Sequence, residues 1–168
     1  MKHFKSTFSN AMLVSTILVC LLLVYALYSM VVQLPQYSYT SFTFWGISLA
    51  FCLVVLTMIY AFIQQLKMVI ITDTDIIIQK MYGNIIIPIN EIQEVSPKKH
   101  IASDIRTCGI SGLFGHIGWF SNKQIGRYFA LVKDGDTMLT IRTKNNKCYV
   151  ISCQDHLHAM DLLNKSVK

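Results

Sequence analysis

The stretch between Lys5 and Lys67 contains no Lys, Arg, Asp or Glu. Two long apolar runs lie within it, Ala11 to Val32 and Phe44 to Ile63. A helix rises about 1.5 Å per residue, so a helix over either run is about 30 Å long and matches the hydrocarbon core of a bilayer. The sequence therefore predicts a membrane protein with two spans, at about residues 11–32 and 44–63.

The first run does not fit a cleaved secretory signal. It is longer than the roughly 7 to 15 apolar residues of a signal core, no small-x-small cleavage site follows it, and a second run comes soon after. Cys20 follows Val19 in the middle of the run, which also argues against a lipoprotein signal. We expect an uncleaved helical hairpin over residues 1–66 and a soluble domain over residues 67–168.

The positions of the cations predict the orientation of the hairpin. Lys2 and Lys5 precede the first span and Lys67 follows the second, whereas the connecting segment Gln33 to Ser41 has no Lys or Arg. The positive-inside rule places both termini in the cytoplasm of a two-span cell-membrane protein. Aromatic residues cluster at the opposite boundary and are interpreted as interfacial anchors, with a ligand site as the alternative: Tyr37, Tyr39, Phe42, Phe44 and Trp45.

Charge and composition exclude several classes of function. Neither span contains a carboxylate, His or Arg of the kind that transporters and proton pumps place at depth, so conduction by this hairpin alone is not expected. The net charge is +6, but the cations are dispersed, which argues against nucleic acid as a partner and favours the anionic leaflet. The five cysteines are expected to be free thiols, because the domain is placed in the reducing cytosol.

The soluble segment alternates short β-branched runs with turn dipeptides. Asp-Gly, Gly-Asn and Asn-Asn supply the positive φ angles that tight hairpins need. After the last strand, Ser152 and Asp155 form a plausible capping box for a C-terminal helix with Leu157, Met160 and Leu163 at helical spacing. The pattern predicts an α+β roll of about seven antiparallel strands closed by one helix. The clearest strands are expected at residues 68–72, 75–81, 128–132, 137–143 and 147–151.

The segment Arg106 to Phe120, with glycines at 109, 112, 115 and 118, resembles the central motif of the bacterial pleckstrin-homology (PH) domain family. Flanking segments agree with the same family: Ile71–Asp73, Met81–Gly83, Ile85–Ile89, Ile92–Val95, Ile141–Lys144 and Tyr149–Ser152. The resemblance covers roughly residues 67–165 and implies a PH-like antiparallel β-roll behind a membrane hairpin. It implies no reaction, because fold does not fix function.

The pattern of the four glycines in this motif argues against a phosphate-binding loop. No Gly-Lys-Ser/Thr ending follows them and no Gly-x-Gly-x-x-Gly opens a helix. We interpret them as allowing a tight loop and a bulged strand entry, with Leu113, Phe114, Trp119 and Phe120 packing beside them. A backbone cradle for a ligand is the alternative.

PH domains that hold phosphoinositides use Lys and Arg around the first hairpin turn. Here that turn is Thr72 to Asp75, and its two carboxylates, Asp73 and Asp75, would repel a phosphorylated headgroup. A different set of cations could face the bilayer or an acidic partner, or be solvated loop charge. These candidate lipid- or partner-contacting residues are Lys98, Lys99, Arg106, Lys123 and Arg127.

Catalytic and metal-binding patterns are weak. His156 and His158 diverge by about 200° on a helix and cannot chelate one metal. Cys148 and Cys153 form no Cys-x-x-Cys motif, and a thiol pair of Cys108 with His116 has no orienting third group. We therefore expect no catalytic residue, no cofactor and no metal.

Two functions remain open from the sequence. The first is a non-enzymatic, membrane-tethered interaction module that presents a protein-binding surface, with weak lipid contact, at the cytoplasmic membrane face. The second is a small accessory subunit or regulator of a membrane transport or envelope-assembly complex that docks through the hairpin. The bilayer and an unidentified protein are the expected partners, and homo-oligomers are also open.

Overall fold

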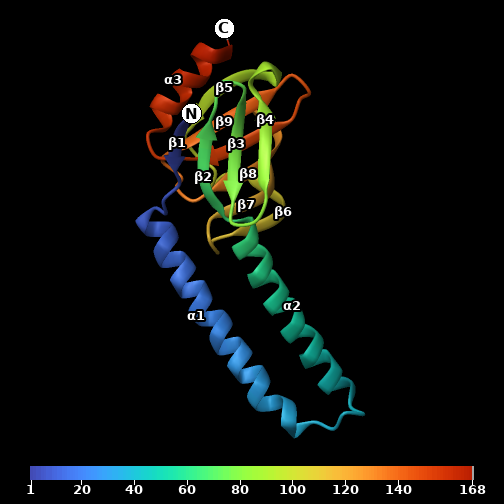
Figure 1. Cartoon of the computed structure of the whole chain (residues 1–168). Helices are drawn as coiled ribbons and strands as arrows, with labels where there is room; N and C mark the ends of the chain where they lie inside the picture. Colours follow the sequence, from blue (N-terminus) through green and yellow to red (C-terminus); the bar gives the residue numbers. More distant parts are fainter. Residues whose placement is uncertain (168) are drawn as a thin grey trace.

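A computed structural model describes residues 1–167. Figure 1 shows two parts: a β-rich domain and a pair of long helices, α1 (Asn10–Gln33) and α2 (Phe42–Gln64), that project from one end of it. A short 3-10 turn, η1 (Leu34–Gln36), lies in the connection at the far end. Both termini lie in the β-rich part, so the helices form a hairpin that leaves the domain and returns to it.

The two helices coincide with the two predicted spans. Segments Asn10–Gln36 and Phe42–Gln64 are long and apolar enough to cross a membrane. Ser9 and Ser41 cap their N-termini, each accepting a backbone N–H with its hydroxyl. Within the described residues, α1 buries no residue against the rest of the chain and α2 buries only Ala61. Their apolar surfaces are therefore available to lipid or to other membrane helices.

Two sheets form the domain within residues 1–167. The first, sheet A, has the order β1-β2-β3-β4, and the second, sheet B, has the order β5-β9-β10-β8-β7-β6. Neighbouring strands are antiparallel except for β8 and β10, which are parallel. The bounds are β1 Lys2–Lys5, β2 Leu66–Ile71, β3 Asp75–Lys80, β4 Asn84–Pro88, β5 Ile92–Lys98, β6 Ile105–Ser111, β7 His116–Asn122, β8 Gly126–Val132, β9 Met138–Thr143 and β10 Cys148–Ser152, with a 3-10 turn η2 at Ile89–Glu91.

The N-terminal strand β1 was not predicted from the sequence. It precedes α1, yet it pairs with β2, which follows α2, with Phe4 opposite Val69. Phe4 is buried in the core between the sheets. The chain on both sides of the hairpin thus belongs to one sheet, and both ends of the hairpin meet the domain.

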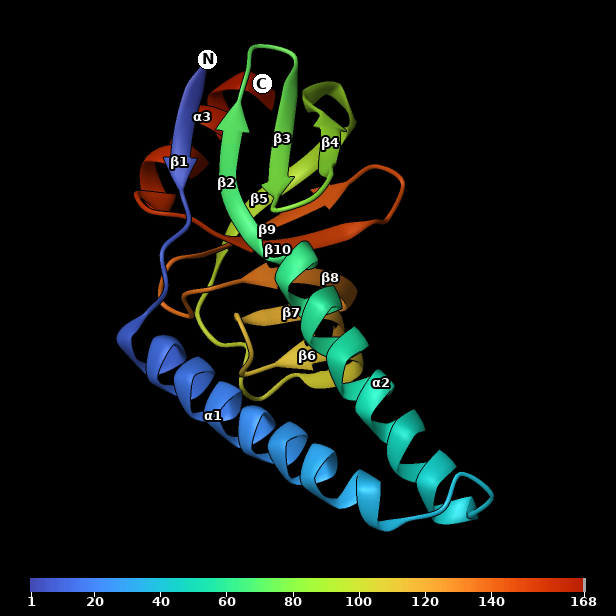
Figure 2. The ribbon, with the colours of Figure 1, turned by 60° about the horizontal axis from the view of Figure 1, so that its bottom comes forward.

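The main core lies between the inner faces of the two sheets and is extended by α3 (His156–Val167). Figure 2 shows the arrangement of the two sheets and α3. The strands of sheet A alternate as expected, with Val69, Ile76 and Ile78 fully buried. Helix α3 contributes Ala159 and Leu163 from its apolar face. This arrangement of a β-roll with a C-terminal helix confirms the predicted PH-like α+β fold behind a helical hairpin. The described residues form ten strands, where about seven were expected.

A second, smaller core lies on the other face of sheet B. Phe120, Tyr128 and Val150 from three strands pack there with Ile101. Ile101 belongs to the loop between β5 and β6, which folds back over the sheet and covers this face.

The predicted capping box of the C-terminal helix is wrong. Ser152 ends β10, and its buried hydroxyl accepts a hydrogen bond from the backbone N–H of Lys133 at 2.8 Å. The backbone at Asp155 is left-handed, with φ 54°, and the helix begins at His156. The Ser152 side chain therefore ties two strand ends together instead of starting a helix.

Candidate functional site

Lys98, the first of the predicted contact residues, is an internal ion-pair partner. Its Nζ lies 2.6 Å from Asp104 Oδ2 and 5.1 Å from the centre of the Tyr128 ring. The Lys98 and Asp104 side chains are 9% and 1% exposed. This ion pair, at the edge of the second core, holds the β5–β6 loop against the sheet. The Lys98 ammonium is therefore already paired and is poorly accessible to a partner.

Asp104 is the centre of this polar cluster. Asn122 Nδ2 and the Tyr128 hydroxyl also donate to its two oxygens. Burial alone would raise the pKa of Asp104, but the hydrogen bonds from Lys98, Tyr128 and Asn122 outweigh it and lower the pKa below the ordinary value. Asp104 is therefore ionised at neutral pH and balances the charge of Lys98.

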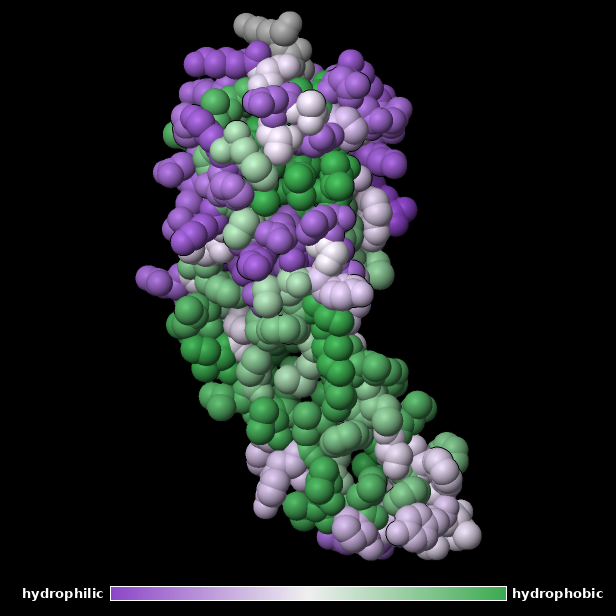
Figure 3. Space-filling model, in the orientation of Figure 1, coloured by the Kyte–Doolittle hydropathy of each residue, from purple (hydrophilic) through white to green (hydrophobic). Residues whose placement is uncertain are grey.

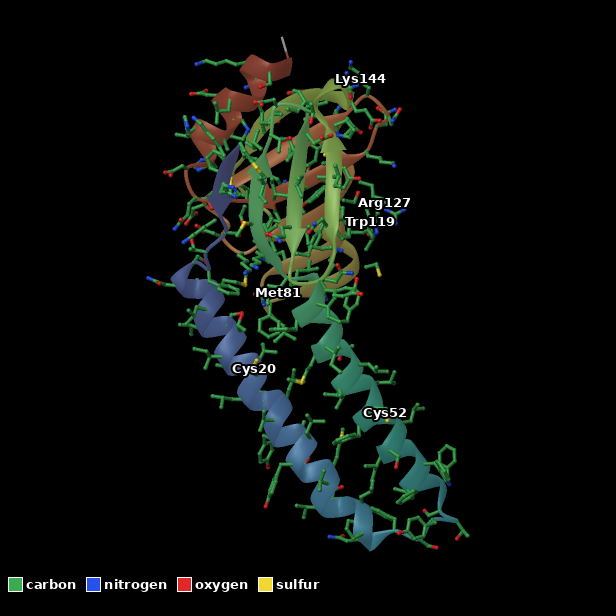
Figure 4. The ribbon with its side chains drawn as sticks, viewed as in Figure 1. Cys20, Cys52, Met81, Trp119, Arg127 and Lys144 are labelled. Carbon is green, nitrogen blue, oxygen red and sulfur yellow. The ribbon has the colours of Figure 1, made fainter. Side chains whose placement is uncertain are left out.

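Arg127 is also engaged within the domain. Its guanidinium carbon lies 4.7 Å from the centre of the Trp119 ring, and Trp119 in turn packs edge-on against Phe129 at 5.3 Å. Figure 4 shows Arg127 and Trp119 together on one side of the domain. The pair forms an exposed cation–aromatic contact that stabilises the β7–β8 ladder.

The remaining candidates lie around two different pockets. Lys99 and Lys123 line an open pocket of about 640 Å³ between the β5–β6 loop and the β7–β8 turn. Arg106 lines a smaller pocket of about 380 Å³ together with Ser111 and His116. Lys98 also lines the larger pocket, so three of the five candidates share it, whereas Arg106 and Arg127 are not among its lining residues.

The β2–β3 turn lies at the end of the domain opposite the helices (Figures 1 and 2). It carries Asp73 and Asp75, and the Thr72 hydroxyl donates to the Asp75 carbonyl at 2.8 Å to close it. The turn that carries Lys and Arg in phosphoinositide-binding PH domains therefore carries two carboxylates here, at the end of the domain farther from the helices.

The glycine-spaced motif forms the β6–β7 hairpin. Gly109 and Gly118 are cross-strand partners, both with φ above +120°. A Cβ on Gly109 would collide with the Ile117 carbonyl oxygen, and one on Gly118 with that of Cys108. Glycine is required at both positions, because the two backbones approach too closely for any side chain.

The tip of this hairpin contacts both membrane helices. The Ser15 hydroxyl of α1 donates to the Gly112 carbonyl at 2.8 Å, and the Phe114 N–H donates to Thr16 Oγ1 at 3.2 Å. The Phe114 ring packs against Phe62 of α2 at 6.0 Å. The tip therefore lies between the two helices where they leave the domain.

The outer face of sheet A carries an apolar row that the sequence analysis missed. Ile70, Ile77 and Ile86 are direct cross-strand partners on β2, β3 and β4, and Ile86 is 61% exposed. Their neighbours along each strand point into the core. Figure 3 shows an apolar patch on this face of the domain, surrounded by hydrophilic residues. We call these three residues the isoleucine row.

A signal for this row was present in the sequence. Strands β3 and β4 each contain three consecutive isoleucines, 76–78 and 85–87. A strand with one wet face alternates apolar and polar residues, whereas an uninterrupted run indicates apolar residues on both faces.

The described residues contain no group of three or more His, Cys, Asp or Glu side chains arranged to hold a metal ion. His116 Nδ1 hydrogen-bonds to Ser111 Oγ at 2.5 Å, whereas Cys108 stands opposite Trp119 in the same ladder. Burial raises the pKa of the Cys148 thiol, and it raises that of Cys153 to about 12. These two thiols are protonated at neutral pH and poorly nucleophilic.

Comparison with known proteins agrees with this fold. Residues 67–167 match the family model described as a bacterial PH domain. No curated protein and no solved structure matches the chain. Because the matched segment spans most of the sequence and coincides with β2 to α3, the chain belongs to the bacterial PH domain family.

Proposed function

We propose that this protein is a non-enzymatic interaction module that its hairpin holds at the cytoplasmic face of the cell membrane. The isoleucine row is the observation that carries this proposal. Ile86 is exposed and Ile70 and Ile77 beside it are half-buried, so the three form one contiguous apolar patch. An apolar patch with a polar rim is typical of a protein-binding surface. The row lies on the outer face of a regular, well-packed sheet, so it is displayed on a rigid support.

The surroundings of the row favour a protein over the bilayer as its partner. The strands of sheet A run from the helix end of the domain to the opposite end (Figure 1). With the hairpin across the membrane, the outer face of this sheet is therefore directed parallel to the membrane plane and not toward it. A second cytoplasmic segment can approach this face, whereas the lipid surface below cannot reach the middle of it. Lys67 and Lys80 lie near the membrane end of the same sheet, and Asp73 and Asp75 at the other end.

Affinity purification of the tagged full-length protein from gently solubilised membranes tests the proposal. The variant Ile77→Ser with Ile86→Ser should lose a specific partner that the wild type retains. Leu157→Ser on α3 is the matched control, because Leu157 is 58% exposed and lies outside the row. Equal recovery of every partner with the double variant and with the control would contradict a role for this surface.

A second candidate function rests on the hairpin. Helices α1 and α2 leave almost all of their apolar surface uncovered by the rest of residues 1–167. An accessory subunit or regulator of a larger membrane transport or envelope-assembly complex would use that surface to pack against the helices of its partner.

Exchange of the hairpin discriminates between the two candidates. Residues 10–64 can be replaced by an unrelated two-helix hairpin while β1 and β2 are kept. Partner binding that survives the exchange supports the interaction module, and loss of binding with a folded domain supports docking through the hairpin.

A further inference from the structure

A groove opens between the start of α1 and the domain. It has a volume of about 490 Å³, and its α1 wall is formed by residues from the first turns of the helix, Ser9, Ala11, Met12 and Ser15. The opposite wall comes from the β5–β6 loop, the β6–β7 tip and the β8–β9 turn. These residues belong to the start of the candidate span Asn10–Gln36, which would place the groove near the level of the lipid headgroups in a membrane.

Basic and hydrogen-bonding side chains gather along the domain wall of this groove. Lys99 and His100 come from the β5–β6 loop and His116 from β7. The smaller pocket that holds Arg106 shares Ser111 and His116 with the groove, so the two hollows adjoin at these residues. Four basic residues, two of them permanently charged, thus line two adjoining hollows.

Few carboxylates oppose these cations. Among the described residues that line the two hollows, the acidic ones are Asp136 and Asp104. Asp104 is already paired with Lys98 at 2.6 Å. Lys99 and Arg106 therefore outweigh Asp136, and the balance favours an anion. The positive end of the α1 dipole at Ser9 acts in the same direction.

We propose that the groove binds the phosphate group of a membrane phospholipid, with Lys99 and Arg106 as its charged ligands and with the acyl chains lying along α1. Arg and Lys are the side chains that bind phosphate by charge-assisted hydrogen bonds, and the Ser111 hydroxyl and the His116 ring add further donors. Ala11 and Met12 on the helix side offer an apolar surface that suits the glycerol and upper acyl carbons. The site differs from the β2–β3 turn in position and in charge.

Binding at this site is linked to protonation of His116. Burial and the neighbouring Arg106 lower the pKa of His116. A bound phosphate would neutralise the charge of Arg106 and accept a hydrogen bond from the protonated His116 ring. Both effects would raise the pKa of His116 and favour its protonated form. The other charged or titratable groups at the two hollows are Lys99, His100 and Asp104 of the β5–β6 loop and Asp136 of the β8–β9 turn, and α1 contributes none among its described lining residues.

The test uses full-length protein, stripped of lipid in a neutral detergent and titrated with dioctanoyl phosphatidylglycerol or with inorganic phosphate. Native mass spectrometry counts the bound lipid, and calorimetry gives the dissociation constants. The variant Lys99→Gln with Arg106→Gln should bind the lipid about tenfold more weakly or worse, because it loses both charge-assisted contacts. Lys123→Gln with Lys144→Gln removes the same charge outside the groove and should stay within about twofold of wild type.

The two probes distinguish the source of the phosphate. Tighter binding of the lipid than of inorganic phosphate, lost in the groove variant, supports a phospholipid site. Equal affinity for both probes, again lost in the groove variant, contradicts the lipid and assigns the groove to a soluble phosphate anion. Equal binding by the wild type and the groove variant, or no binding of either probe, overturns the proposal altogether.

The pH dependence gives an independent readout. Wild-type affinity for the lipid should rise severalfold between pH 8 and pH 6, and His116→Gln should abolish most of that rise while it leaves the circular dichroism spectrum unchanged. Affinity that rises equally in the variant would assign the effect to His100 and contradict the role given to His116.

Discussion

Lys133 Nζ donates a hydrogen bond to Gln65 Oε1 at 3.0 Å, and this bond joins the domain to the end of α2. The same ammonium lies 4.5 Å from the centre of the Phe8 ring, just before α1, and the Lys133 carbonyl accepts from the Ser9 N–H at 3.4 Å. One buried lysine at the end of β8 therefore contacts both connections between the domain and the hairpin. A substitution of Lys133 should therefore alter the contacts of the domain with both α1 and α2.

The first prediction concerns the pH dependence of stability at this joint. Burial lowers the pKa of Lys133 from 10.5 to about 8. Between these values the unfolded chain holds a proton that the folded chain has released, so folding stability rises with pH across this window. The melting temperature of the wild type relative to Lys133→Met should therefore increase from pH 8 to pH 10.5. A difference that stays constant over the window would contradict the buried state of this lysine.

The second prediction concerns the ion pair that closes the second core. Asp104→Asn leaves Lys98 buried without its counter-charge and should destabilise the domain by about 3 kcal/mol at pH 7, measured by chemical denaturation. The pKa of Asp104 is lowered in the fold, so its contribution is present above the ordinary value of 3.8 and is lost as pH falls through the lower folded value. Asp136→Asn, at an exposed position, should change stability by less than about 0.5 kcal/mol.

The third prediction concerns the paired glycines of the β6–β7 hairpin. Gly109→Ala combines a positive φ with a collision against the Ile117 carbonyl, and it should cost at least ~2 kcal/mol or prevent folding. Gly135→Ala is the control, because a Cβ there meets no atom within 4 Å. Protease resistance of the full-length protein measures both. A stable Gly109→Ala protein would show that the two strands can separate without loss of the fold.

The fourth prediction concerns β1. A fragment that begins at Gln65 should give a mostly β circular dichroism spectrum, since its turns and C-terminal helix are complete. It lacks the buried Phe4, however, so joining residues 1–8 to it through a flexible linker should raise its stability by about 3 kcal/mol or more. The same fusion with Phe4→Ala should lose that gain. Equal stability of all three fragments would mean that β1 is not part of the domain.

The fifth prediction concerns topology. Cys108 is the exposed thiol of the described part of the domain, whereas Cys148 and Cys153 are buried. A membrane-impermeant maleimide should not label the wild type in intact cells and should label Cys108 after permeabilisation. Tyr39→Cys, in the loop between the helices, should be labelled in intact cells. Labelling of Cys108 before permeabilisation would reverse the predicted orientation.

Local sequence signals predicted much of this fold. The spans were found because hydropathy over twenty residues is a strong signal, and the β2–β3 and β3–β4 hairpins were found because their turns contain Asp, Asn and Gly. Strand β1 was missed because Lys2 to Lys5 is short and half charged, and because its partner β2 follows the entire hairpin in the sequence. A local sequence pattern cannot indicate a contact between segments so far apart in the chain.

The candidate site was less predictable, because it depends on how a loop folds back. Lys98 and Asp104 are neighbours only after the β5–β6 loop covers the second core. Arg127 is held by Trp119 from an adjacent strand. In contrast, the isoleucine row could have been recognised, since three consecutive isoleucines in each of two paired strands put apolar side chains on both faces of the sheet.

The most direct test of the proposed function is site-specific photo-crosslinking in intact cells. A benzophenone amino acid replaces Ile86 in the isoleucine row or, as the control, Leu157 on α3. We expect a discrete adduct with another protein from position 86, absent from position 157 and lost when Ile77→Ser is added. No adduct from position 86, or the same adducts from both positions, would contradict a protein-binding surface on sheet A.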